Sequence, residues 1–445
     1  MSGYPQREQS YSHPEIFSAP RRRLSIGPAE LFLFIAPLAQ FVQIQTIGVL
    51  SGTDILLLMA FPLVVLRNLR LLRQRHVFMI LLLGLGWLIS QVITDLIRDT
   101  PPSDFLRVWS KIGLTLTHFT TIYLLTHRSR RRFLIFGFGF AAGQLLTLRI
   151  NPGVFFAASP WKFGYCGPVT LVVFLLISTL PFFRKRDMLG LLAAVAIAMT
   201  NLYMGARGVA LISLLAGIYV FSLRRAGTAR LRGPRLVIAI SVVLLSGWIF
   251  MSFYSYLAQT GELGVKAQSQ YETQGGGEGG VLLGGRSEIL ASAMAIFDSP
   301  IIGHGSWAKD PKYKFILEER RRELGYARVG VDTGDDLIPS HSHVFGAWVE
   351  AGVMGAVFWF YIFYMVLRIM MKAPGSEPLL PVGIFVSIAM LWNIFFSPYG
   401  AEMRVVFAYF ASGILLLDQL RRDQLGRARP GSLPGSRGGE KAYSL

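Results

Sequence analysis

Charged residues and cysteine are scarce in this sequence. Charged side chains make up 16% of the 445 residues, whereas soluble domains carry roughly 25%. The single cysteine, Cys166, cannot form an internal disulfide, and its neighbours show no metal-ligand spacing. These shortages argue against an ordinary soluble domain, a disulfide-stapled scaffold and a cysteine-based metal site.

Long apolar runs, by contrast, are abundant. Hydrophobic residues make up 52% of the chain, and they recur in runs of about 18–22 residues, the length of a membrane-spanning helix. The net charge of +18 does not indicate nucleic-acid binding, because Lys and Arg cluster between the apolar runs, as they do in cytoplasmic loops. The sequence therefore predicts an all-α polytopic membrane protein with about twelve transmembrane helices.

Alternating the spans across the bilayer places the basic clusters on one side, so both termini are expected in the cytoplasm. We predict a cytoplasmic tail over residues 1–29, transmembrane helices one to nine over 30–257, a large periplasmic loop with short helices over 258–340, helices ten to twelve over 341–420, and a basic cytoplasmic tail over 421–445. The expected spans are 31–50, 54–66, 77–97, 106–125, 133–148, 167–183, 188–203, 209–223, 236–257, 343–371, 380–396 and 405–417.

The predicted periplasmic loop has three recognisable parts. Gly275–Gly285 is so rich in glycine that we expect a mobile flap there. Arg286–Phe297 has apolar residues at helical spacing, which predicts a short helix on the membrane surface. Lys312–Leu324 predicts a charged, solvated helix. The loop ends at His341, close to the start of the tenth span.

The junction between this loop and the tenth span contains the first candidate site residues. His341 could act as a general base, since a neutral imidazole accepts a proton near pH 7, although His343 and His304 are alternatives. Glu350 falls inside an apolar run, where a charge costs roughly 2.5–3.5 kcal/mol and is read as functional. It lies about half a helical turn around from His341, so we expect it to contact a neighbouring helix or a cation instead.

Three arginines on the outer side are not explained by the positive-inside rule. Arg207, Arg286 and Arg404 could bind a phosphate or diphosphate, because the guanidinium forms bidentate, charge-assisted bonds. Glycines beside Arg207 and Arg286 favour a site, whereas the simpler alternative is contact with lipid phosphates. Acidic residues also precede His341, and a solvated turn explains them better than a metal site. These residues are Asp332, Asp335 and Asp336.

Three segments together resemble the O-antigen ligase / O-unit polymerase superfamily of bacterial membrane glycosyltransferases. The first is Ala206-Arg207-Gly208, which is similar to the family's Ser-Arg-Gly, with alanine in place of serine. The second is Gly285-Arg286 followed by Phe297, Pro300, Gly303 and Gly305. The third is His341-Ser342 followed at the family's spacing by Glu350, Gly352, Val353, Met354 and Gly355.

The resemblance implies an inverting glycosyltransferase of the bacterial inner membrane that needs no metal or cofactor. It implies an undecaprenyl-diphosphate-linked glycan as donor and either lipid A–core or a growing polysaccharide as acceptor, on the periplasmic side of the lipid bilayer. His341 would be the base and Arg207 and Arg286 the diphosphate contacts, with Glu350, His343 and Arg404 in support. A polysaccharide polymerase of the same superfamily and a non-enzymatic transporter of lipid-linked oligosaccharide are the alternatives.

Overall fold

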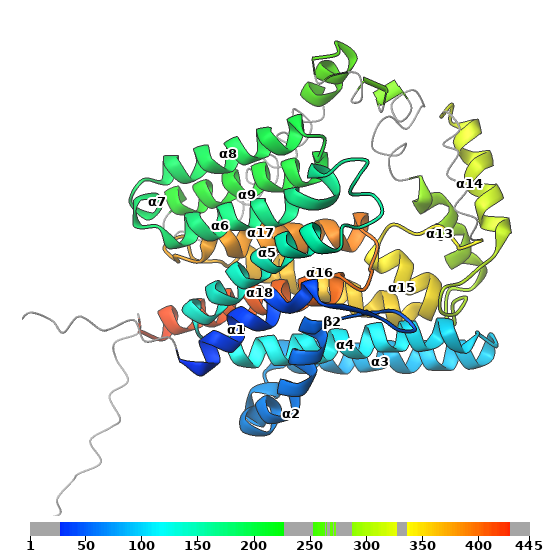
Figure 1. The fold of residues 1–445 in the computed structure, drawn as a ribbon, viewed down its shortest axis with the longest axis horizontal. Helices are drawn as coiled ribbons and strands as arrows, with labels where there is room; N and C mark the ends of the chain where they lie inside the picture. Colours follow the sequence, from blue (N-terminus) through cyan, green and yellow to red (C-terminus); the bar gives the residue numbers. More distant parts are fainter. Residues whose placement is uncertain are drawn as a thin grey trace, which may run out of the picture.

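The computed structural model is an all-α bundle with one small β-hairpin (Figure 1). It describes residues 27–226, 252–262, 264, 268–269, 271–272, 287–326 and 336–427. The elements are α1 (Pro28–Leu38), η1 (Ala39–Phe41), β1 (Gln43–Gln45), β2 (Val49–Ser51), α2 (Gly52–Leu72), α3 (Arg75–Ile97), α4 (Pro102–Thr126), α5 (Arg130–Ile150), η2 (Trp161–Tyr165), α6 (Cys166–Thr179), α7 (Pro181–Lys185), α8 (Asp187–Tyr203), α9 (Arg207–Ala226), α13 (Glu288–Asp298), α14 (Pro311–Glu323), α15 (His343–Ala351), α16 (Val353–Met370), α17 (Leu380–Phe396) and α18 (Met403–Arg427).

Seven helical segments within the described residues are long and apolar enough to cross a membrane, which indicates a multi-pass membrane protein. These segments are Gly52–Leu72, Arg75–Ile97, Arg130–Ile150, Trp161–Thr179, Arg207–Arg225, Val353–Met370 and Met403–Leu425. Three shorter apolar helical segments accompany them: Pro28–Phe41, Asp187–Tyr203 and Leu380–Phe396. A total of twelve spans and a periplasmic location for the large loop stay predictions, and most of the expected ninth span lies outside the described residues.

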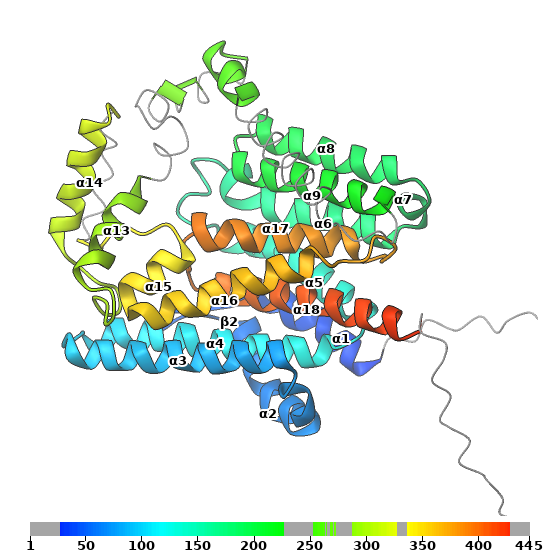
Figure 2. The ribbon, with the colours of Figure 1, turned by 180° about the vertical axis from the view of Figure 1, so that it is seen from behind.

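The long helices lie side by side, and two short helices occupy one end of the bundle (Figures 1 and 2). In the lower half, α4 packs between α2 and α18, while α3 packs along α16. In the upper half, α17 contacts α6 and α9, and α9 pairs with α8. At the end of the bundle, α13 packs against both α14 and α15. The loop predicted over 258–340 therefore returns to the bundle at α15.

The prediction of one continuous span over Leu31–Leu50 is wrong. The helix α1 ends at Leu38, and the chain then forms a hairpin in which Gln43 pairs with Ser51. The reason is visible in the sequence, where apolar Val42 and Ile44 alternate with glutamine. That period of two residues favours a strand over a helix. The two helices predicted in the loop are confirmed as α13 and α14.

The tenth predicted span, 343–371, is also not one helix. It is divided into α15 and α16 at Gly352, which has φ +67° and ψ −159°, a conformation that is nearly exclusive to glycine. A Cβ atom at this position would collide with the carbonyl oxygen of Ile301. The glycine thus lets the loop after α13 approach the helix break closely.

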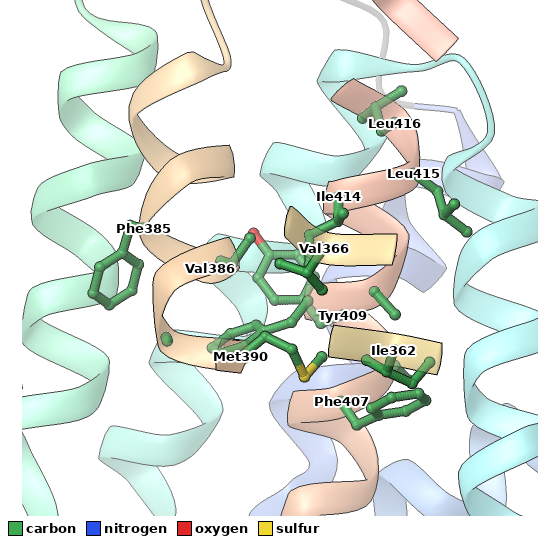
Figure 3. Close-up of a cluster of buried hydrophobic side chains, with 14 of the residues drawn as sticks. Ile362, Val366, Phe385, Val386, Met390, Phe407, Tyr409, Ile414, Leu415 and Leu416 are labelled. Carbon is green, nitrogen blue, oxygen red and sulfur yellow. The ribbon is translucent and has the colours of Figure 1, made fainter. Parts of the chain in front are cut away.

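The core of the bundle lies where α16, α17 and α18 meet (Figure 3). Tyr409 and Phe407 of α18 are buried among Met390 of α17 and Ile362 of α16, and they belong to one continuous apolar cluster. Glycine on a neighbouring helix permits this packing, since a Cβ at Gly137 would collide with the Tyr409 hydroxyl. Close contact through small residues is a common way for helices to associate in a membrane.

Candidate functional site

Two of the three segments that carry the family resemblance pack against each other. The loop after α13 lies on the end of α15, where the His304 N–H donates to the Val349 carbonyl at 2.7 Å and the Gly305 N–H donates to the Glu350 carbonyl at 3.1 Å. Gly303 and Gly305 have φ of +87° and +92°, which glycine adopts without strain. The glycines of this motif therefore fix the loop in place beside Glu350.

Asp95 of α3 holds the same loop from the other side. Its carboxylate is 2% exposed and accepts hydrogen bonds from the Ser306 backbone N–H at 2.6 Å, the Ser306 hydroxyl at 2.7 Å and the Trp109 indole at 2.7 Å. A buried carboxylate needs such donors, because leaving it without partners is costly. Asp95 thus ties the loop to α3 and α4.

A cavity of about 260 Å³ opens between this loop, α3, α4, α15 and the segment after α17. Glu350 enters it from α15 and Lys111 from α4, with Glu350 Oε2 and Lys111 Nζ 3.4 Å apart. The expectation that Glu350 contacts a cation on a neighbouring helix is confirmed. The remaining described lining residues are Trp87, Trp307, Ala308, Leu337, Ile338, Ser340, Ser342, His343, Gly346, Ala347, Val349, Pro398 and Tyr399.

His343 lines this cavity but is otherwise enclosed. It is 1% exposed, with its ring centroid 4.8 Å from that of Trp359 and 4.9 Å from that of Tyr399. Its Nδ1 lies 2.7 Å from the Ser397 carbonyl oxygen. Because a carbonyl only accepts, Nδ1 carries the proton of the neutral ring, and Nε2 is left as the acceptor. The structure thus gives His343 one fixed orientation.

His341 precedes α15, and its side chain lies close to the start of α13. Half of its side chain is exposed, and its Nδ1 is 3.8 Å from Glu288 Oε1 at the start of α13. It is not among the described residues that line the cavity. Arg286 lies outside the described residues, two positions before Glu288 in the sequence. The Gly275–Gly285 segment also lies outside them.

The other two arginines contact different parts of the bundle. Arg207 begins α9, and its Nη1 donates to the Tyr254 hydroxyl at 3.1 Å while its Cζ lies 4.9 Å from the Tyr254 ring centroid. Arg404 is 6% exposed and pairs with Asp54 at 2.8 Å. It also donates to the Val49 carbonyl at 2.9 Å, which joins α18 to the hairpin and to α2. Arg404 is therefore bound by the protein itself, where it holds α18 to α2 and the hairpin.

The Asp54–Arg404 pair has a third buried neighbour, His118 of α4. The His118 Nε2 lies 3.4 Å from Asp54 Oδ1, and the side chain is fully buried. Neither of the two imidazole nitrogens has a hydrogen-bond partner among the described residues. As for metals, no group of three or more His, Cys, Asp or Glu side chains within the described part of the chain could hold an ion. Asp332 and Asp335 lie outside that part.

Three residues at the candidate site were missed by the sequence reasoning: Lys111, Trp307 and Glu288. Lys111 carried a usable signal, because it is an ionisable residue inside an apolar run, like Glu350. Trp307 and Glu288 carried none, since their positions depend on how the loop folds back. In comparisons with known proteins, no family model and no curated protein matched the chain.

Proposed function

We propose that this protein is an inner-membrane glycosyltransferase that transfers an undecaprenyl-diphosphate-linked glycan to an acceptor hydroxyl on the periplasmic face. The observation that carries the proposal is the packing of the glycine loop onto α15, which encloses a cavity beside Glu350. Two sequence segments that resemble the glycosyltransferase superfamily thus form one structural unit, although Gly305 and His341 are 36 positions apart in the sequence.

In the proposed reaction His341 is the general base. The imidazole takes the proton of an acceptor hydroxyl while that oxygen attacks the anomeric carbon of the donor sugar. The bond from the anomeric carbon to the diphosphate oxygen breaks, and undecaprenyl diphosphate leaves from the opposite face with inversion. A positioned base supplies roughly 10²–10⁴-fold of rate. Half-exposed His341 is open to a large substrate, and Glu288 lies close enough to stabilise the imidazolium that forms.

The diphosphate is assigned to Arg207 and Arg286. A fixed guanidinium stabilises the negative charge that grows on the leaving oxygen, and each charge-assisted hydrogen bond contributes about 1.5–3 kcal/mol. Arg207 is held by Tyr254 through both a hydrogen bond and a cation–π contact. Such contacts fix the position of the guanidinium.

The test uses the purified full chain in lipid nanodiscs with a lipid-diphosphate glycan and an acceptor. We expect release of undecaprenyl diphosphate, and a loss of about 10²–10⁴-fold in turnover for His341→Ala. The matched control is His304→Ala, because His304 Nε2 lies 2.7 Å from the Ala295 carbonyl of α13 and His304 is not among the described residues that line the cavity. Wild-type turnover in His341→Ala at an equal protein level would remove His341 as the base.

Whether the acceptor is lipid A–core or a growing polysaccharide is decided by the glycans that accumulate in cells without the activity. Loss of a ligase leaves long lipid-linked chains, whereas loss of a polymerase leaves single repeat units. We propose the ligase reaction first and the polymerase reaction as the alternative. Both use the same donor and the same chemistry at the anomeric carbon.

A transporter of lipid-linked oligosaccharide is the second candidate, and one observation favours it. Asp54, His118 and Arg404 form a buried ionisable cluster among α2, α4 and α18, and such clusters occur along transport and proton pathways. The assay described above separates the two candidates. A transporter moves the lipid-linked glycan across the bilayer with its diphosphate bond intact, whereas a transferase releases undecaprenyl diphosphate.

A further inference from the structure

We propose that the cavity beside Glu350 binds one neutral sugar ring of the acceptor glycan, held by Lys111, Glu350 and Trp307. This inference rests on the proposed function and names the acceptor subsite within it. Its volume of about 260 Å³ lies just below the ~300 Å³ at which pockets for drug-sized ligands begin. A single pyranose suits that size, whereas a lipid chain or an extended glycan does not.

The charge of the cavity favours a neutral ligand with several hydroxyls. Lys111 and Glu350 neutralise each other, and their separation of 3.4 Å exceeds the ~2.7–2.9 Å of a tight charge-assisted bond. Their side chains are 16% and 19% exposed. The ammonium has three N–H donors and the carboxylate several acceptor positions, so both groups have spare capacity. Two adjacent hydroxyls of a sugar could accept from Lys111 and donate to Glu350 at once.

Trp307 lines the cavity with an aromatic ring, and its backbone is in a strained conformation. It has φ +52°, a left-handed conformation that bulky residues rarely adopt. Its backbone N–H donates to Glu350 Oε1 at 3.4 Å, and the Arg107 guanidinium lies 4.5 Å from its ring centroid. Strain of this kind persists where the surroundings enforce it, often at ligand sites. Arg107 covers one face of the indole, and the opposite face carries the same partial negative charge, which attracts the polarised C–H groups of a pyranose.

A second tryptophan, Trp87 of α3, also borders the cavity. It is 1% exposed and lines the cavity. Its indole N–H has no hydrogen-bond partner among the described residues. Buried donors without partners are uncommon in native structures, because each costs free energy. Because that N–H is enclosed by the protein, Trp87 contributes ring surface to the cavity and not a hydrogen bond to a ligand.

The experiment is saturation-transfer NMR on the full chain in nanodiscs, with a panel of neutral methyl hexopyranosides as probes. We expect transfer from the protein to ring protons of at least one probe. Trp307→Ala should abolish it, and Lys111→Met should raise the dissociation constant about tenfold or more, the loss expected for a hydrogen bond to a charged group. The proposal is overturned if the wild-type protein transfers saturation to none of the probes, or if both variants transfer it as strongly as wild type.

Two further variants separate sugar binding from a merely structural ion pair. Lys309→Met is the matched control, because Lys309 pairs with Asp104 at 3.1 Å and is half exposed outside the cavity; its binding should stay within about twofold of wild type. The double variant Lys111→Glu with Glu350→Lys restores the ion pair but exchanges donor and acceptor. We expect it to keep the melting temperature and lose sugar binding. Full recovery of binding would contradict the assigned roles.

The transfer assay distinguishes failure of this inference from failure of the proposed function. If the cavity binds the acceptor sugar, Trp307→Ala raises the acceptor KM while the donor KM stays unchanged. Turnover with an unchanged acceptor KM in Trp307→Ala refutes the subsite but leaves the transferase intact. Sugar binding by a wild-type protein that never releases undecaprenyl diphosphate refutes the transferase, and with it the identity of the sugar as an acceptor.

Discussion

Two of the ion pairs that join helices of this bundle differ in their access to solvent. Arg404 and Asp54 are 2.8 Å apart, with side chains 7% and 1% exposed. Lys111 and Glu350 are 3.4 Å apart, with side chains 16% and 19% exposed, and they border a cavity. Each pair joins residues far apart in the sequence, Asp54 of α2 with Arg404 of α18 and Lys111 of α4 with Glu350 of α15. Sequence separation therefore does not distinguish the two pairs. Burial does.

The difference shows how similar residue types serve different purposes. Asp54 Oδ2 also accepts from the Ser51 N–H at 2.7 Å, and Arg404 donates to two backbone carbonyls, so both partners of the closed pair are tied to the backbone. Asp54 Oδ1 is buried without a hydrogen-bond partner among the described residues. The open pair keeps spare donors and acceptors beside a cavity. A closed pair suits a fixed joint between helices, whereas an open pair suits a ligand.

The largest effect is expected from breaking the closed pair. Asp54→Ala leaves the Arg404 guanidinium buried without its carboxylate, which costs about 3–5 kcal/mol when one partner of a buried pair is removed. The melting temperature in detergent should fall strongly. Glu350→Gln in the same assay is the control from the open pair. If the two variants melt alike, burial does not distinguish the pairs.

Gly352 tests whether the open pair depends on the loop that packs above it. Gly352→Ala places a side chain in a conformation that costs on the order of 1–3 kcal/mol, and its Cβ would collide with Ile301. We expect lower stability and a displaced glycine loop, with Asp54 and Arg404 unaffected. Gly153→Ala is the matched control, since nothing lies within 4 Å of a Cβ there. Faster hydrogen exchange confined to residues 299–307 and α15 would support the expectation.

Removing the open pair should change stability least among the substitutions within the bundle. A partly exposed ion pair contributes about 0–1 kcal/mol, so Lys111→Met should melt within a few degrees of wild type. The measurement is the melting temperature of Lys111→Met, determined in parallel with that of Asp54→Ala. A loss as large as that of Asp54→Ala would show that Lys111 is a structural residue and would weaken its assignment to a ligand.

The sequence predicted much of the helical architecture but only part of the site. The span expected at Leu380–Phe396 is α17, because a long apolar run specifies a helix in a membrane protein directly. The break at Gly352 was missed, since its cause is the approach of Ile301 from another part of the chain. Glu350 was identified from its cost in an apolar run, and the same rule applied to Lys111 would have identified both sides of the cavity. Which histidine lines the cavity depends on tertiary contacts that no local pattern contains.

A third ion pair extends the comparison to the surface and should give the smallest effect. Asp298 of α13 accepts from Lys312 at 2.7 Å and from the Tyr313 hydroxyl at 2.6 Å, and these bonds lower the pKa of Asp298 below its ordinary value of 3.8. Because the folded pKa is lowered, the contribution to stability is present above the ordinary value and is lost as the pH falls through the lowered one. Asp298→Asn at neutral pH should speed hydrogen exchange in α13 and leave the bundle unchanged.

The control for this surface pair is Glu323→Gln, since Glu323 pairs with Arg320 within α14 and joins no second element. After correction for intrinsic exchange, the difference between Asp298→Asn and wild type should shrink as the pH falls from the ordinary pKa of 3.8 through the lowered pKa of folded Asp298. A difference that stays constant across this range would mean that the Asp298 charge does not hold α13 to α14, and that apolar contacts such as those of buried Tyr313 do so instead.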